Sequence, residues 1–175
     1  AGTGSLCRYL APRLRGNQTW HLLDYSPSLL EQGEARFMMW AAQHALIVKS
    51  EAGIWCASNG VTEYRITTEV RDFVNGLGTF STSFSPDVIT ASAFLDLVSL
   101  SWIEQLVAFC KKVRTSFYGS LTYNGIMEWN PDHPFDLEFL QFLNDDQQRD
   151  KGMGPALGAN SSQAISQSFA SSGFL

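Results

Sequence analysis

The sequence has few charged residues and no excess of positive charge. Charged residues make up 17% of its 175 positions and the formal net charge is −5, against a charged share of about 25% in an average globular domain. Such a chain has no basic face to neutralise a phosphate backbone, which argues against a nucleic-acid partner. Apolar residues make up 45%, and the length predicts one domain with a sizeable core.

Cysteine is also scarce, and long apolar runs are absent. The three cysteines, Cys7, Cys56 and Cys110, are odd in number and far apart, with no C-x-x-C pair. This pattern predicts neither a disulfide framework nor a zinc site, and it indicates a reducing, cytoplasmic compartment. The three histidines share no ligand spacing, so we predict no metal. No window has the length and apolarity of a membrane span, and no signal peptide is visible.

Among the features that are present, a glycine-rich turn stands out because an acid follows it at an informative distance. The turn is Ala1-Gly2-Thr3-Gly4-Ser5, and Asp24 lies twenty positions after Gly4, at the end of the apolar run 20–23. In adenosine-type cofactor sites the glycines allow a sharp turn and close approach to the backbone, while the acid accepts hydrogen bonds from the ribose hydroxyls. Such a turn normally follows a buried strand, so we expect the chain to be a fragment.

Periodicity along the chain predicts alternating strands and helices. We expect helices over 5–14, 27–41, 95–113, 135–143 and 161–171, and strands over 20–24, 61–70, 87–92 and 115–123. Asn124-Gly125 predicts a two-residue hairpin turn, and the stretch from Gly76-Leu77-Gly78 through the following serines a loop. The alternation predicts an α/β fold with a Rossmann-like, mostly parallel sheet and helices on both faces, lacking its first strand and its last strands.

Five separated segments fall where a candidate strand ends. They are the glycine turn with Gly2 and Gly4, Asp24, Asp72, Ser92 and Asn124. Because ligands bind at the carboxyl ends of parallel strands, we expect all five to converge on one edge of the sheet.

Several of these segments also match the motifs of a known family. The matching residues are Ala1-Gly2-Thr3-Gly4, Asp24, Arg71-Asp72-Phe73, the stretch 90–99 and the stretch 148–158. Together they resemble class I S-adenosylmethionine-dependent methyltransferases, and the two longer stretches look like a little-characterised bacterial subgroup of that family. The resemblance implies S-adenosyl-L-methionine as cofactor. The cofactor-binding set that it implies is Gly2, Thr3, Gly4, Asp24, Tyr25, Asp72, Phe73 and Ser92.

The resemblance also implies methyl transfer to a small-molecule or protein acceptor by a single, partial domain spanning 1–175. An insertion at about 124–158 would cover the site, with Arg149-Asp150-Lys151 as a mobile lid. A general base is optional in this chemistry, because it depends on the acidity of the acceptor. Weak catalytic candidates are Asp96, Tyr123 and Asp150. Other residues that could face the methyl group are Asn124, His133, Asp136 and Arg149.

Plainer interpretations stand beside these expectations. A lone pair of glycines is commonly an ordinary turn, Asp24 can be a helix N-cap, and a carboxylate such as Asp96 near a first helical turn is stabilised by about 0.3–1 kcal/mol without any catalytic duty. Two other functions remain open. One is an NAD(P)-dependent oxidoreductase, which would prefer glycine or alanine where Cys7 stands. The other is a non-catalytic cofactor-fold domain that acts as a partner subunit.

Overall fold

The structure is a computed structural model that describes residues 1–51, 53–74, 76–77, 85–120 and 123–174. The chain divides into two units, Ala1–Asp72 and Phe73–Leu175. Each unit has its own cluster of buried apolar side chains. The two units are therefore described one at a time.

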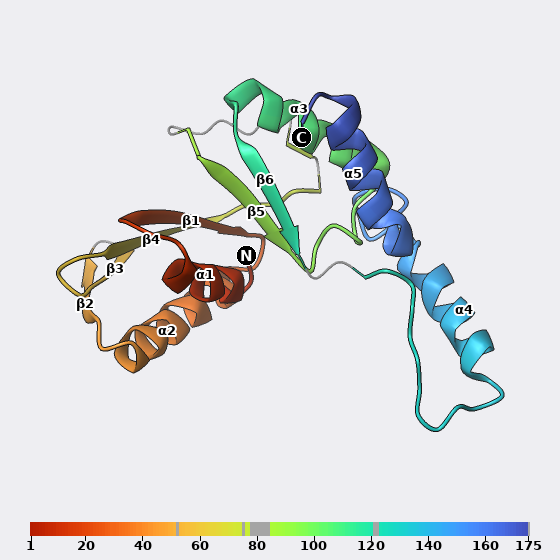
Figure 1. The fold of residues 1–175 in the computed structure, drawn as a ribbon, viewed down its shortest axis with the longest axis horizontal. Helices are drawn as coiled ribbons and strands as arrows, with labels where there is room; N and C mark the ends of the chain where they lie inside the picture. The colour runs from red at the N-terminus through yellow and green to blue at the C-terminus, as the bar shows by residue number, and fades with distance from the viewer. Residues whose placement is uncertain (52, 75, 78–84, 121–122, 175) are drawn as a thin grey trace. The chain divides into compact units, whose positions relative to one another are not determined.

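The first unit is built on a four-stranded sheet in the order β1-β4-β3-β2, shown in red to yellow in Figure 1. Its strands are β1 (Gln18–Asp24), β2 (Ile47–Glu51), β3 (Ile54–Ser58) and β4 (Glu63–Val70). β1 and β4 pair in parallel, with Asp24 opposite Val70. β2 and β3 form an antiparallel hairpin, and β3 also pairs with β4 in antiparallel orientation.

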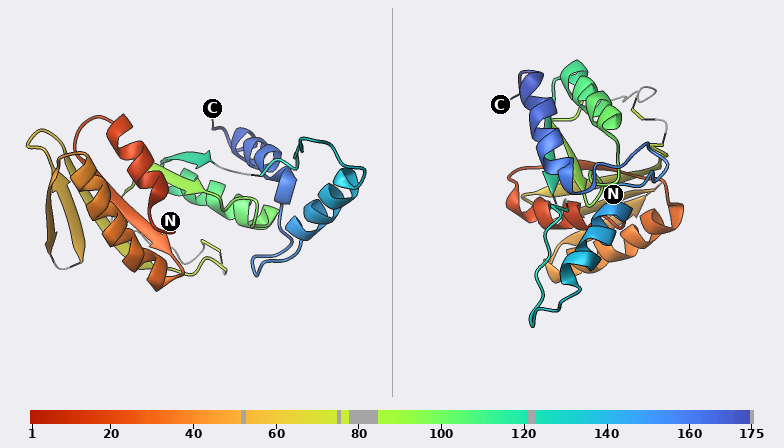
Figure 2. Two further views of the ribbon diagram at one scale, coloured as in Figure 1. Left: turned by 90° about the horizontal axis from the view of Figure 1, so that it is seen from below. Right: turned by 90° about the vertical axis from the view of Figure 1, so that its right-hand side faces the viewer.

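Two helical segments cover one face of this sheet (Figure 2). α1 (Ser5–Leu10) runs into the short 3-10 helix η1 (Ala11–Arg13), and α2 (Pro27–Gln43) follows β1. The Ser26 hydroxyl accepts a hydrogen bond from the Leu29 amide at 3.4 Å and so caps α2. Alternate residues of β3 and β4 are buried and pack with the apolar side of α2. The buried residues of α2 are Leu30, Gly33, Phe37, Trp40 and Ala41.

The second unit contains a separate two-stranded parallel sheet. β5 (Val88–Ser92) pairs with β6 (Ser116–Ser120), with Ser92 opposite Ser120. An isolated pair of strands is marginally stable at best, and here α3 (Leu100–Val113) and α5 (Ser161–Ser171) supply the remaining core. The rings of Phe117 and Phe169 stack at 5.3 Å between centroids, which fixes α5 against β6. α4 (Asp136–Gln147) has no buried residue, and η2 (Gly158–Asn160) precedes α5.

The predicted Rossmann-like, mostly parallel sheet with helices on both faces is wrong. The described strands form one mixed sheet, in which only β1 and β4 are parallel, and a second sheet of two parallel strands. Parallel pairing across the helical crossovers is present within each sheet, as the alternation of strands and helices suggests. What the alternation misses is the antiparallel hairpin β2–β3, which takes up the second edge of β4.

Two local predictions also need correction, and part of two others lies outside the described residues. No strand follows Asn124-Gly125 at 126–129, and the Asn124 side-chain oxygen instead accepts a hydrogen bond from the Ile126 amide at 3.1 Å. The helix predicted from residue 95 begins at Leu100, because the Ser99 hydroxyl caps it by accepting from the Trp102 amide at 3.4 Å. The predicted loop beyond residue 77 and residues 121–122 of the predicted strand 115–123 lie outside the described residues.

Candidate functional site

The glycine turn and Asp24 are in direct contact in the first unit. Gly2 and Gly4 have φ values of 54° and 76°, in the left-handed region that favours glycine. The Gly4 amide donates to the Ala1 carbonyl at 3.0 Å and closes the turn. The Gly2 amide and the Ala1 nitrogen both donate to Asp24 Oδ2, at 2.7 Å and 2.9 Å. The structure thus brings together two motif elements separated by twenty positions.

Asp24 is held as a carboxylate by these donors. Its second oxygen, Oδ1, accepts from the Ser26 amide at 3.0 Å, and the side chain is 13% exposed. Burial by itself raises the pKa of Asp24, but the hydrogen bonds from the Ser26 and Gly2 amides act in the opposite direction, and the pKa is lowered. A carboxylate has about four lone-pair sites. Among the described residues Oδ1 has a single donor, so it retains room for a ligand hydroxyl.

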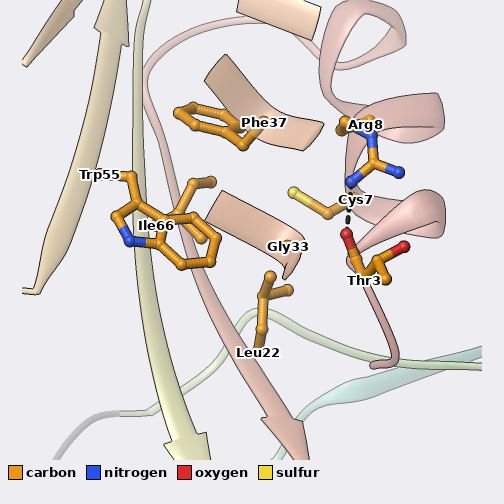
Figure 3. A pocket seen from close by; sticks show the side chains of 9 residues that line it. Thr3, Cys7, Arg8, Leu22, Gly33, Phe37, Trp55 and Ile66 are labelled. Atoms are coloured by element: carbon orange, nitrogen blue, oxygen red, sulfur yellow. Dashed lines mark hydrogen bonds between the residues drawn. The ribbon is translucent and has the colours of Figure 1, made fainter. Parts of the chain in front are cut away.

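Below the turn, the described residues are closely packed and enclose no ligand cavity. A narrow gap beside Thr3 and Gly4 has no room for a water molecule. Arg8 of α1 donates to the Thr3 carbonyl across this region (Figure 3). Cys7 is buried there, and its burial raises the pKa of the thiol to about 12 even though Arg8 opposes the shift. The gap is lined by Thr3, Gly4, Cys7, Arg8, Leu22, Gly33, Phe37, Trp55 and Ile66. Apart from Thr3 and Gly4, which belong to the turn, these residues pack beneath it.

Asp72 follows the carboxyl end of the strand beside β1. β4 ends at Val70. The Arg71 amide donates to the Asp24 carbonyl at 2.8 Å, so the segments that continue from β4 and β1 stay hydrogen-bonded one residue beyond the ladder. Asp72 comes next and is exposed. Tyr25, which follows β1, is 73% exposed. Asp24 therefore ends β1 and Asp72 follows β4 at the same end of two neighbouring, parallel strands.

A polar cluster on β1 and β4 was not predicted. His21 Nε2 lies 3.1 Å from Glu69 Oε2 and His21 Nδ1 lies 2.7 Å from Thr67 Oγ1, while Arg71 pairs with the other oxygen of Glu69. The hydrogen bond from His21 is the largest influence on the pKa of Glu69, which it lowers together with Arg71 against the effect of burial. Only the parallel register, with His21 opposite Thr67, brings these residues together. The sequence pattern has no signal for that register.

The other members of the implied cofactor set belong to the second unit. The Phe73 ring packs edge-to-face against Phe94 and Trp102, with centroids 6.3 Å and 6.4 Å away, and the Phe73 carbonyl accepts from Trp102 Nε1 at 3.0 Å. Phe73 is therefore part of an aromatic core cluster. Ser92 is the last residue of β5, opposite Ser120. The predicted set is thus divided between the units.

The three catalytic candidates have different surroundings. Asp96 Oδ1 and the Tyr123 hydroxyl are buried atoms without a hydrogen-bond partner in the described part of the chain. Leaving such a group unpaired costs about 1–3 kcal/mol. Asp150 is exposed, and its Oδ1 accepts from the Gly152 amide at 2.7 Å, which is a local turn contact. Asp96 and Tyr123 are therefore the candidates that need an explanation.

The remaining residues named from the sequence make local contacts. Asp136 Oδ2 accepts from the His133 amide at 2.7 Å, just before α4 begins. Arg149 forms an exposed ion pair with Asp146 at 3.3 Å. Contacts of this kind typically shape turns and contribute little to stability. They give no sign of a role in catalysis.

In comparisons with protein-family models, curated proteins and solved structures, the chain matches none. Over the described ranges, no three His, Cys, Asp or Glu side chains gather in a way that could hold a metal ion. None of the helices within those ranges combines the length and apolar character that crossing a bilayer requires.

Proposed function

We propose that the first unit binds S-adenosyl-L-methionine through the glycine turn and Asp24, and that the protein transfers the methyl group to a small-molecule or protein acceptor. The observation that carries this proposal is the 2.7 Å hydrogen bond between the Gly2 amide and Asp24 Oδ2. It joins the turn that would approach the cofactor to the acid that would hold its ribose. The motif resemblance of Arg71-Asp72-Phe73 supports the same assignment.

The surroundings of the turn suit a ligand that approaches its backbone. At Gly2 no atom of the described residues lies within 4 Å of the place where a Cβ would stand, so one side of the turn is open to them. At Gly4 the corresponding position lies 3.0 Å from Leu22 Cδ1, so the other side is packed. Asp24 Oδ1 would accept from a ribose hydroxyl, and the exposed Asp72 carboxylate would accept from the adenine amino group.

The chemistry asks for orientation more than for acid–base groups. When bound, the sulfonium supplies an already activated methyl group. Asp24 and the glycine turn would fix the cofactor in one pose, which converts an encounter into an oriented reaction. The proposal includes a cytoplasmic location and an acceptor other than nucleic acid.

Calorimetric titration of the full chain with S-adenosylhomocysteine, and separately with NADH, tests the proposal. We expect binding of S-adenosylhomocysteine, weakened about 10- to 150-fold in Asp24→Asn, because a hydrogen bond to a charged acceptor is worth about 1.5–3 kcal/mol. Asp132→Asn, an exposed acid of the second unit, is the matched control and should leave the affinity unchanged.

Three outcomes would contradict the proposal. Binding of NADH alone would favour the oxidoreductase. An affinity for S-adenosylhomocysteine that Asp24→Asn does not change would remove the role of the turn. Binding without methyl transfer to any fraction of a cell extract would favour a non-catalytic partner subunit.

A further inference from the structure

Five buried side-chain oxygens in the second unit have no hydrogen-bond partner in the described part of the chain. They are Asp96 Oδ1, Tyr123 OH, Asn144 Oδ1, Gln147 Oε1 and Ser161 Oγ. Ser161 is 0% exposed, whereas the other four residues are half-buried and only the named oxygen of each is shielded from solvent. Native proteins leave few such groups unpaired, and each one calls for an explanation such as a bound water, ion or ligand. We call these five atoms the oxygen cluster.

Three of the five residues belong to segments that meet at Gly158. The Gly158 amide donates to the Asp96 carbonyl at 2.9 Å. A Cβ placed on Gly158 would lie 3.4 Å from Gln147 Cβ, so α4 packs directly against this glycine. Ser161 begins α5 immediately after the η2 turn that Gly158 opens. The loop after β5, the end of α4 and the start of α5 therefore share one contact region.

The other two residues join the same region through Gly125. Asn144 Nδ2 donates to the Gly125 carbonyl at 3.4 Å, and a Cβ on Gly125 would come within 2.6 Å of Ala159 Cβ. Ala159 lies in η2, between Gly158 and Ser161. Tyr123 stands two positions before Gly125 in the loop after β6. All five residues thus come from four segments that pack around residues 158–161.

Two members of the cluster also follow the carboxyl ends of parallel strands. Ser92 and Ser120 end β5 and β6 opposite each other. Asp96 follows four positions after the first, and Tyr123 three positions after the second. In sheets with parallel strands this edge is the common place for a ligand.

The chemistry of the cluster favours a positively charged guest. The Asp96 carboxylate and the two side-chain amide oxygens can only accept hydrogen bonds or coordinate a cation, and the two hydroxyls can do the same. Asp96 is half-buried with Oδ1 shielded from solvent, and shielding a carboxylate oxygen is costly without a positive partner. Hard cations take carboxylate, amide carbonyl and hydroxyl oxygens together, and an ammonium group offers several donors to the same set.

We propose that the second unit binds a small cation in the oxygen cluster, with Asp96 supplying the negative charge. The cation is a hard metal ion or the protonated amine of a small molecule. This site does not depend on the proposed methyl transfer, because its residues lie outside the first unit.

Thermal unfolding of the full chain in different salts tests this proposal. Calcium, magnesium and methylammonium chlorides are compared at equal ionic strength with choline chloride, whose cation is too bulky for a buried cluster. We expect one of the three to raise the melting temperature by about 5–10 °C at a hundred times its dissociation constant. A shift in calcium or magnesium chloride would identify the guest as a metal ion, and a shift in methylammonium chloride would identify it as a protonated amine. Equal melting temperatures in all four salts would overturn the proposal and leave the cluster to water.

Two variants locate the effect. Asp96→Asn should abolish the cation-dependent shift, whereas Asp132→Asn, an exposed acid of the same unit, should retain it. Gln147→Glu adds a second carboxylate and keeps the proposal testable if Asp96→Asn does not fold. It should lower the cation concentration that gives half of the shift by about tenfold or more. An unchanged half-point in Gln147→Glu, or a full shift in Asp96→Asn, would place the cation elsewhere.

Discussion

Replacing Asp24 with asparagine keeps the shape of the side chain and removes its charge. In the wild type, Oδ2 accepts from the Gly2 amide at 2.7 Å and Oδ1 from the Ser26 amide at 3.0 Å. A hydrogen bond to a charged group is worth about 1.5–3 kcal/mol and one between neutral groups about 0.5–1.5 kcal/mol. Asparagine has one oxygen and an NH2 group that cannot accept, so one of these bonds becomes a neutral one and the other is lost, which together costs about 3 kcal/mol. For a chain of this size that lowers the melting temperature by about 6–12 °C.

The cost should depend on pH in a defined direction. The pKa of Asp24 is lowered in the folded protein, so the unfolded chain takes up the proton first as the pH falls. The stabilisation is complete above the unfolded value of about 3.9 and is lost as the pH falls through the lower, folded value. Asp24→Asn has no charge to lose at this position. The difference in stability between the two proteins should therefore shrink towards low pH.

Urea unfolding followed by tryptophan fluorescence measures this difference between pH 7 and about pH 3. Asp132→Asn reports the effect of removing an exposed acid and should change the free energy of unfolding by less than about 0.5 kcal/mol. Equal stability of wild type and Asp24→Asn at neutral pH would refute the reasoning. A difference that stays constant down to the lowest pH would show that the charge is not what stabilises the turn.

Further predictions concern the glycines and thiols of the first unit. Gly2→Ala should lower the free energy of unfolding by about 1–2 kcal/mol because of its left-handed backbone, and Gly4→Ala by more, because its Cβ would also lie 3.0 Å from a leucine methyl. Equal losses for the two variants in urea unfolding would contradict this. Gly33→Ala should raise the free energy of unfolding by about 0.5–1 kcal/mol, since alanine favours the helix more than glycine and its Cβ would lie no closer than 3.4 Å to a neighbour. A decrease in the free energy of unfolding would disprove this prediction. With Ellman's reagent on the native protein, the half-buried Cys56 should react before Cys7, whose burial raises its pKa to about 12, and the reverse order would be inconsistent with the packing below the turn.

Local signals in the sequence predict the helices well. Ser26-Pro27 correctly marks the start of α2, and the apolar periodicity predicts α3 and α5. These predictions succeed because a helix is stabilised by caps and by side chains three or four positions apart. The start of α3 was placed too early, since the apolar period extends back into the turns before Ser99.

Strand partners were harder to predict because they depend on distant residues. The strands β2 and β3 are five residues each, and no strand was predicted between residues 44 and 60. Asn124-Gly125 has the composition of a hairpin turn, but such a turn requires a second strand, and 126–129 does not form one. The order of strands and helices along the chain does not reveal which edges of each strand are already paired with another strand. The pairing of those edges decides between one parallel sheet and the two sheets observed.

The candidate sites also differ in whether local sequence signals or distant contacts create them. The spacing of the glycine turn and Asp24 predicts that they lie at the same edge of the sheet, and the structure adds the direct hydrogen bond between them. The oxygen cluster has no such spacing, because its members come from segments that meet only through tertiary packing, such as that of α4 with η2. Asp96 and Tyr123 were named from the ends of strands, whereas Asn144, Gln147 and Ser161 were not named at all.

The two-stranded sheet of the second unit has a consequence for amide hydrogen exchange. Along β5 and β6 successive main-chain groups point to opposite sides of the strand, and each strand has one partner strand among the described residues of this unit. About half of the amides in Val88–Ser92 and Ser116–Ser120 therefore point away from the partner strand. Protection from exchange should alternate from residue to residue along both strands, as a two-residue rhythm that a central strand with partners on both edges does not show.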